Sequence, residues 1–345
     1  MAATKREQAA ERTSAAAQLR PDIERKVLAI LRVVADDGGP VGARIIADKL
    51  RAHGIELSER AVRYHLKLMD DRGLTESLGE QGRVITDYGR QELQSARVSD
   101  KLGFVISRVD SLAYRVTLDL RTGKGKIILN ASLLPADRFA DCINIMRRVF
   151  EAGYCMSELV AVADAGEHIG DLRVPQGSVG FATVCSVTLN GLLLKSGIPV
   201  ESRYGGLLEI RDRRPYRFTD LVGYHESTLD PAEIFIASKM TSINTAATEG
   251  AGKVLASLRE VPAVCLADLE RVLAGARKHG LGGVLAVGKP GQPLLGVHIG
   301  IDRVGLAVVG GLAPVAALEE SGIATVNKAM TGLAEMRDLQ LVAQT

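Results

Sequence analysis

Residues 58–85 read SERAVRYHLKLMDDRGLTESLGEQGRVI, a stretch that predicts one helix followed by a short hairpin. The helix begins at an N-capping serine, ends at a glycine and places its apolar residues on one face: Ser58, Gly73, Val62, Leu66 and Met69. Strands over 74–77 and 84–85 enclose a two-glycine tip over 79–83. This order predicts the recognition helix and the wing of a winged helix-turn-helix domain.

The residues around this stretch complete the same domain. A first amphipathic helix is predicted after Pro21, with its apolar face formed by Ile23, Val27, Ile30, Leu31 and Val34. A second helix is predicted over 43–53, and a closing helix runs through Leu93. Residues 1–19 are predicted to form a disordered arm. We therefore expect a winged-helix DNA-binding domain over 20–98.

The outward face of the 58–73 helix carries three cations and a tyrosine. Arginine can bond bidentately to guanine edges, whereas lysine and tyrosine contact phosphates. With an arginine at the wing tip, the predicted DNA-binding residues are Ser58, Glu59, Arg60, Arg63, Tyr64, Lys67 and Arg83. The alternative is a solvated charged face on an ordinary three-helix bundle.

Composition excludes several other classes of protein. The 345 residues carry 43 Lys+Arg and 41 Asp+Glu, and a net charge of +2 leaves nucleic-acid binding to a local surface. No stretch approaches the roughly 18 apolar residues that span a bilayer, and we expect a cytoplasmic protein. The four cysteines form no Cys-x-x-Cys pair, so buried, reduced thiols are expected, with no metal site and no cofactor: Cys142, Cys155, Cys185 and Cys265.

An internal repeat organises the remainder, 99–345, which we expect to be an effector-binding regulatory domain. Gly125-Lys126-Ile127 recurs 127 positions later as Gly252-Lys253-Val254, and Ser196-Gly197-Ile198 recurs 125 positions later as Ser321-Gly322-Ile323. These offsets predict a duplicated unit with halves of about 101–227 and 228–345. In the first half, strands are predicted over 104–107, 113–118, 126–129, 158–163 and 179–184, with helices after Pro135 and over 187–196. Without a Rossmann glycine fingerprint, this alternation predicts an α+β domain.

The two halves differ in polarity at one place. The first half reads TVCSVTLN over 183–190, where the second reads VVGGLAPV over 308–315, and Arg203-Tyr204 has no counterpart. A Gly-rich strand-to-helix turn with hydroxyls and one arginine suits a small carboxylate or phosphate. The candidate effector site is Thr183, Cys185, Ser186, Thr188, Asn190, Arg203 and Tyr204. The alternative is that these residues cap a helix and that Arg203 pairs with an acid.

Three segments resemble the regulatory domain of the NrpR family, the archaeal nitrogen-regulatory repressors. They are TVCSVTLNG over 183–191, SRYGGLLE over 202–209, and DPAEIFI over 230–236 with MTS over 240–242, which adds Thr241 and Ser242 to the candidate site. Residues 22–95 resemble the winged helix named for ribonuclease R. The resemblance implies a repressor that binds a palindromic operator as a homodimer or higher oligomer. It also implies that 2-oxoglutarate, a signal of nitrogen scarcity, releases the operator.

Two other functions compete with a ligand-responsive regulator. The first is an enzyme tethered to nucleic acid, with Cys185 as nucleophile and a histidine as base, chosen from His168, His225, His279 and His298. Nothing in the sequence brings these groups together. The second is RNA binding through the winged helix, which lacks the aromatic stacking platform of single-strand readers.

Overall fold

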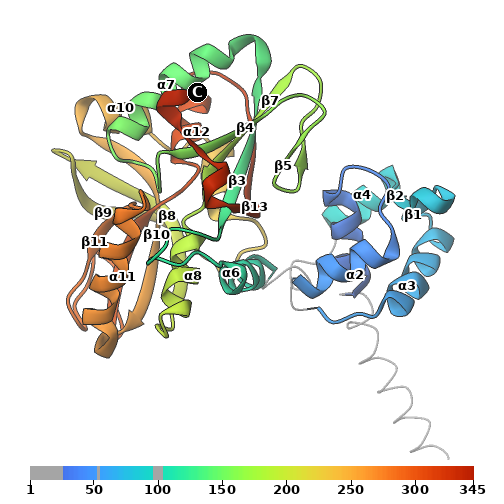
Figure 1. Ribbon diagram of the computed structural model, residues 1–345, viewed down its shortest axis with the longest axis horizontal. Coiled ribbons are helices and arrows are strands. Elements are labelled where there is room, and N and C mark those ends of the chain that lie inside the picture. Colours follow the sequence, from blue (N-terminus) through green and yellow to red (C-terminus); the bar gives the residue numbers. More distant parts are fainter. Residues whose placement is uncertain (1–25, 53–54, 96–103) are drawn as a thin grey trace, which may run out of the picture. The chain divides into compact units, whose positions relative to one another are not determined.

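The computed structural model describes residues 26–52, 55–95 and 104–345 (Figure 1). The chain divides into two compact units, Met1–Leu102 and Gly103–Thr345. The predicted arm over 1–19 and the predicted domain limit at 98/99 lie outside the described residues. Each unit is described by itself below.

Unit 1 confirms the predicted order of elements. Residues 26–36 are helical, followed by α2 (Ala43–Ala52), α3 (Glu59–Asp71), β1 (Thr75–Ser77), β2 (Arg83–Ile85) and α4 (Asp87–Ser95). The first three helices form the core because their apolar faces meet, and the wing closes on it through Leu74 and Ile85. The wing is an antiparallel pair that pairs Thr75 with Ile85, and a bridge from Val41 to Arg83 extends it. Unit 1 is a winged helix.

Unit 2 is built on two five-stranded sheets (Figure 1). The first has the order β13-β3-β7-β4-β14, with bounds Val326–Glu335, Lys126–Pro135, Ser178–Val184, Leu159–Ala163 and Gln340–Leu341. The second has the order β11-β12-β10-β8-β9, with bounds Val284–Val287, Arg303–Val309, Gly252–Pro262, Glu201–Arg211 and Arg214–Gly223. A small hairpin, β5 (His168–Ile169) with β6 (Leu172–Arg173), stands apart. The ladders are antiparallel, as an α+β domain requires.

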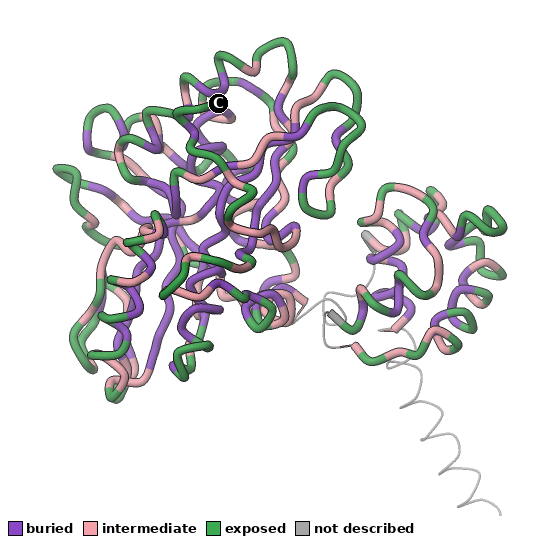
Figure 2. The backbone as a smooth tube through the Cα atoms, viewed as in Figure 1, coloured by how far each residue is buried: buried purple, intermediate pink, exposed green. Residues whose placement is uncertain are grey.

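Helices of unit 2 pack in two groups. The helices are α6 (Phe104–Arg115), α7 (Phe139–Glu151), α8 (Val187–Lys195), α9 (Pro231–Ala237), α10 (Ile243–Glu249), α11 (Leu266–Lys278) and α12 (Ala313–Glu320). One group brings α7, α10 and α12 together, and the other brings α6, α8 and α11 together. Buried segments, purple in Figure 2, run through the strands between them.

Two predicted strands of unit 2 were wrong. Strands were expected over 104–107 and 113–118, but Phe104–Arg115 is the helix α6. Valine, isoleucine and tyrosine favour strands, and that local preference misled the prediction. The buried residues Val105, Val109, Leu112 and Ala113 recur at helical spacing instead. Tertiary packing of this face decides the conformation.

Candidate functional site

The exposed face of α3 carries the predicted DNA-binding residues. Ser58 caps the helix, since its Oγ accepts a hydrogen bond from Ala61 N at 3.2 Å. Val62, Leu66 and Met69 are buried as expected, together with His65. Arg60, Arg63, Tyr64 and Lys67 are exposed, and Glu59 is half-buried. Arg63 forms an ion pair with Glu59, a surface contact of at most about 1 kcal/mol that a nucleic acid can replace.

Arg83 is held differently from the other predicted cations. Its Nε donates to Asp70 Oδ2 at 2.8 Å, and Thr75 Oγ1 donates to Asp70 Oδ1 at 2.6 Å. The glycine-containing tip is the short 3-10 turn η1 (Gly79–Gln81), and Arg83 begins the return strand behind it. Arg83 therefore fixes the wing against α3 and is partly neutralised, which leaves Arg60, Arg63 and Lys67 as the exposed cations of the helix.

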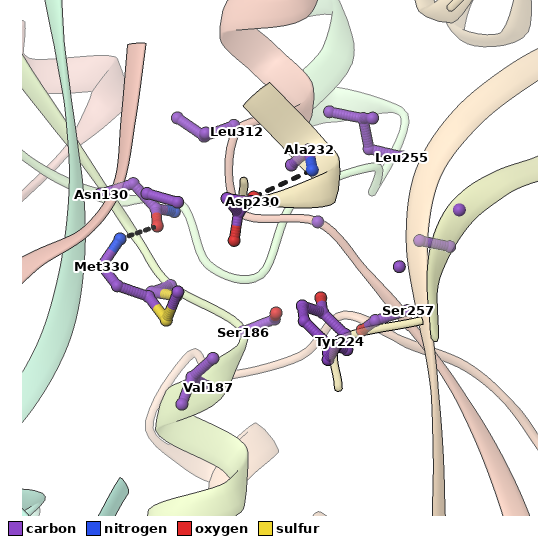
Figure 3. Close-up of a pocket in the computed structure, with 17 residues that line it drawn as sticks. Asn130, Ser186, Val187, Tyr224, Asp230, Ala232, Leu255, Ser257, Leu312 and Met330 are labelled. Atoms are coloured by element: carbon purple, nitrogen blue, oxygen red, sulfur yellow. Dashed lines mark hydrogen bonds between the residues drawn. The ribbon is translucent and has the colours of Figure 1, made fainter. Parts of the chain in front are cut away.

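A cavity of about 40 Å³ lies in unit 2 where elements of both sheets meet. That volume suffices for a few water molecules. The turns that precede α8 and α12 form two of its walls, and strands β3, β8, β10 and β13 form the others. The polar side chains that line it are Asn130, Ser186, Tyr224, Asp230 and Ser257 (Figure 3).

A buried arginine stands directly behind this cavity. Arg259, on β10, is 1% exposed, and its Nη2 donates to Ser186 Oγ at 2.9 Å. Its Nε and Nη1 have no hydrogen-bond partner, and no described carboxylate forms an ion pair with it. Burial lowers the pKa of Arg259, but a guanidinium remains protonated at neutral pH. An uncompensated buried cation costs several kcal/mol, so this group favours an anionic ligand.

Two acids stand at the start of α9, and one of them, Asp230, lines the cavity. Asp230 caps the helix by accepting from Ala232 N at 2.9 Å, and Glu233 Oε1 accepts from Ala329 N at 2.7 Å. Burial raises the pKa of Asp230, and burial together with the charge of Asp230 raises the pKa of Glu233 to about 7. An acid held toward its neutral form can donate a hydrogen bond to an anion rather than repel it.

Helix geometry adds to the preference for an anion. Both α8 and α12 begin at the cavity, and helix N-termini attract negative charge. Gly310 and Gly311 form the turn before α12. A Cβ on Gly311 would lie 2.3 Å from Val184 O and 2.4 Å from Asn130 Nδ2, so only glycine fits there. The chemistry assembled here is that of a small-anion receptor.

Of the nine predicted effector residues, Cys185 and Ser186 line the cavity. Thr188 Oγ1 accepts from Ile128 N at 3.0 Å and ties α8 to β3. Thr183 contacts Asn130 Nδ2 at 3.4 Å, and Asn190 Nδ2 donates to Ser202 Oγ at 2.9 Å. The last three side chains are therefore buried structural links around the cavity.

The other four predicted residues lie away from the cavity lining. Arg203 forms an ion pair with Glu260, and its Nη2 donates to Tyr204 OH at 3.1 Å, as in the alternative weighed from the sequence. Ser242 follows Thr241 and precedes α10 without a side-chain capping bond, and its Oγ accepts from Lys253 N at 2.7 Å. Arg203 is therefore engaged by Glu260, whereas Arg259, which is not itself part of the lining, contacts the lining residue Ser186.

Sequence reasoning missed Arg259, Tyr224 and Asp230. Aligned at the 127-residue offset, Arg259-Glu260 stands where the first half has Ser132-Leu133. Two charged residues in the run 254–261, whose other members are apolar except for Ser257, were the available signal, because such a pair is rarely buried without a partner. At these positions the second half is the more polar, the reverse of the difference between 183–190 and 308–315 from which the candidate site was predicted.

The geometry gives no support to a catalytic cysteine. Burial raises the pKa of Cys185 to about 12, so its thiol stays protonated and is a poor nucleophile. No described histidine contacts it, and His279 Nε2 is engaged by Leu120 O at 2.7 Å. All four cysteines are free of disulfides, and no cluster of metal-ligating residues occurs among the described ranges. No described helix is long and apolar enough to cross a membrane.

A winged helix joined to an α+β unit that contains a polar cavity defines a class, the regulators of transcription. Residues 102–340 match the family "NrpR regulatory domains NRD1 and 2", and residues 28–93 match the "Ribonuclease R winged-helix domain". The chain belongs to the NrpR family of nitrogen regulators. Proteins of this family are regulators and not enzymes.

Individual relatives agree with this assignment. The chain is 42% identical over 303 residues to the global nitrogen regulator NrpRI of Methanosarcina mazei, covering 88% of this chain and 93% of that protein. It is 32% identical over 311 residues to the global nitrogen regulator NrpR of Methanococcus maripaludis, covering 90% of this chain and 54% of that protein. The crystal structure of a nitrogen repressor-like protein from Methanococcus jannaschii superposes with a TM-score of 0.59 at 27% identity, covering 69% and 98% of the two chains.

Proposed function

We propose that this protein represses nitrogen-assimilation genes by binding duplex operator DNA, and that 2-oxoglutarate releases it. The observation that carries the effector part is the buried guanidinium of Arg259, with two unpaired nitrogens behind a cavity lined by hydroxyl and amide groups. A carboxylate would accept the fork of N–H donors that Arg259 leaves unused. This assignment replaces Arg203 by Arg259 as the anion receptor.

The DNA-binding part rests on the exposed face of α3. Arg60, Arg63 and Lys67 are exposed cations on the helix that enters the major groove in winged-helix regulators. One such helix makes few base contacts, so we propose a homodimer or larger oligomer on a palindromic operator.

Internal duplication of unit 2 is part of the same proposal. Read from one edge, the sheets run β13-β3-β7-β4 and β8-β10-β12-β11, and these strands correspond one to one at the repeat offset. Each sheet takes two strands from the other half of the unit, β13 and β14 in the first sheet and β8 and β9 in the second. Two helices correspond as well, since α8 and α11 match α12 and α7 at the same offsets, and α6 falls on 231–242, which contains α9. The cavity lies between the halves, where a ligand can bias their arrangement.

The proposal is tested on the full-length chain. Gel shifts with duplex and single-stranded promoter fragments decide whether duplex DNA is the target. Calorimetry with 2-oxoglutarate, with glutarate and succinate as competitors, decides the effector. Preference for single strands contradicts the DNA proposal, and failure of 2-oxoglutarate to bind contradicts the effector proposal.

A further inference from the structure

Met330 lies at an irregular point of β13. It lines the cavity and has a φ of 55°, in the left-handed region that residues other than glycine rarely adopt. The pairing of β13 with β3 shifts register between Lys328 and Gly332, so Met330 stands in a β-bulge. Residues held in this conformation cluster at sites that change shape in function, because the surrounding contacts must hold them there.

Two side chains from different elements hold Met330. Its N–H donates to Asn130 Oδ1 at 3.1 Å, and this bond lies at the cavity wall (Figure 3). Its carbonyl accepts from Arg108 Nε, also at 3.1 Å. Asn130 belongs to β3, whereas Arg108 belongs to α6, so one strained residue connects the cavity lining to α6.

The helix α6 touches the cavity walls in other places. It packs against α8, where a Cβ on Gly191 would lie 2.4 Å from Val116 Cβ just beyond the end of α6, so the backbones are in close contact. Ser186 and Val187 at the start of α8 line the cavity. The Arg108 charge also lowers the pKa of Asp230 and Glu233, opposing the effect of burial.

The position of α6 in the chain connects these contacts to unit 1. It is the first element of unit 2, and the polypeptide reaches it directly from unit 1. At the repeat offset α6 corresponds to 231–242, which contains α9, whereas α10 packs on α12 in the other helix group. We propose that Arg108 is the positioning residue that couples occupancy of the cavity to the winged helix, through the contacts Asn130, Met330 and α6. This inference rests on the proposed function for the identity of the effector.

The mechanism requires a ligand that competes for Asn130. Asn130 Oδ1 accepts from Met330 N, whereas Asn130 Nδ2 donates only a long bond of 3.4 Å to Thr183 Oγ1. An anion that accepts from Nδ2 takes the place of Thr183 and draws the amide toward the cavity, so the bond from Met330 N to Oδ1 is lost and the bulge keeps one of its two anchors. The Met330 carbonyl shifts relative to Arg108, and α6 follows. An effector changes operator affinity only by its differential affinity for the two arrangements, and this chain of contacts is where the arrangements differ.

The first arm of the test needs no effector. Amide hydrogen exchange of the full-length chain is compared for wild type, Asn130→Ala, Arg108→Ala and the double variant, with α10 peptides reporting global destabilisation. Asn130→Ala is expected to speed exchange in α6 at least fivefold relative to α10, and to have no further effect once Arg108 is replaced. Equal effects of Asn130→Ala in both backgrounds overturn the proposal.

The second arm measures coupling. Operator affinity is measured by fluorescence anisotropy with and without saturating 2-oxoglutarate, on a duplex selected with the full-length chain. Arg108→Ala is expected to bind 2-oxoglutarate within about threefold of wild type. Its ratio of operator affinity without 2-oxoglutarate to operator affinity with it should fall at least tenfold below the wild-type ratio, whereas Arg108→Lys keeps part of that ratio. Arg115→Ala, an exposed arginine on the same helix, is expected to keep the full ratio. If Arg108→Ala keeps the wild-type ratio, the coupling role of Arg108 is wrong. If the operator affinity of the wild-type protein does not change with 2-oxoglutarate, only the identity of the effector is wrong, and the hydrogen-exchange comparison decides the coupling.

Discussion

Replacing Arg259 by methionine should make the protein more stable and unresponsive to its effector. The substitution removes a buried cation with two unpaired nitrogens, each costing about 1–3 kcal/mol, and gives up one charged hydrogen bond to Ser186 worth about 1.5–3 kcal/mol. Methionine fills much of the same volume without charge. The net gain in unfolding free energy is therefore about 1–3 kcal/mol, comparable to other buried charges exchanged for apolar residues.

The same substitution should abolish effector binding. Two charge-assisted hydrogen bonds from the guanidinium to a carboxylate contribute about 3–6 kcal/mol, so the dissociation constant should rise at least about a hundredfold. Urea unfolding measures the stability, and calorimetry with 2-oxoglutarate measures the affinity. If Arg259→Met is less stable than wild type by more than about 1 kcal/mol and still binds 2-oxoglutarate with wild-type affinity, Arg259 is not the anion receptor.

Arg203→Met is the matched control for Arg259→Met. It leaves the Glu260 carboxylate, 4% exposed, without its partner. Because Arg203 itself is partly exposed, we expect a loss of about 1–3 kcal/mol in unfolding free energy, less than for a fully buried pair. Effector affinity should stay within about threefold of wild type. If only Arg203→Met abolishes binding, the residue predicted from the sequence is the receptor after all.

Three further substitutions test separate parts of the structure. Arg63→Ala should cost about 1–3 kcal/mol of specific operator binding in anisotropy titrations, whereas Lys67→Ala should weaken all sequences equally and reduce the salt slope by about one; unchanged operator affinity in Arg63→Ala would exclude this face as the reader. Glu233→Gln should remove a pH dependence: the folded carboxyl keeps its proton up to a pKa of about 7, above its unfolded value, so wild-type stability falls as pH rises from about 4.5 to about 7 and is level above. Urea unfolding of both proteins across that pH range measures this. If Glu233 titrates normally, wild type and Glu233→Gln will show the same dependence of stability on pH. Gly191→Ala should destabilise by about 1–3 kcal/mol, against the usual gain for alanine in a helix, because its Cβ would lie 2.6 Å from Ala113 O. A more stable Gly191→Ala protein would show that α6 and α8 are not in close contact.

The winged helix could be predicted from sequence because its signals are local. Ser58 and Gly73 bound the recognition helix, and the 3.6-residue period of Val62, Leu66 and Met69 fixes its buried face. In α6 the residue types favour a strand while the spacing favours a helix, and the spacing decides. The helix is stabilised by its packing against α8 and β13, which no local sequence pattern reveals.

The candidate site could be predicted only in part because its residues meet through distant strand pairing. Cys185 and Ser186 belong to the turn whose composition stands out, and they do line the cavity. Arg259 reaches Ser186 from a strand 73 positions away, and Arg203 finds Glu260 57 positions away. Sequence alone gives no reason to assign either arginine to its partner.

The central claim is that an anion bound at Arg259 controls whether the winged helix holds its operator. The most direct measurement is a titration of 2-oxoglutarate into the complex of the full-length chain with a fluorescent operator duplex, followed by anisotropy for wild type and Arg259→Met. We expect that wild type releases the duplex and that Arg259→Met holds it at every concentration. Equal release from both proteins, or no release from either, would contradict it.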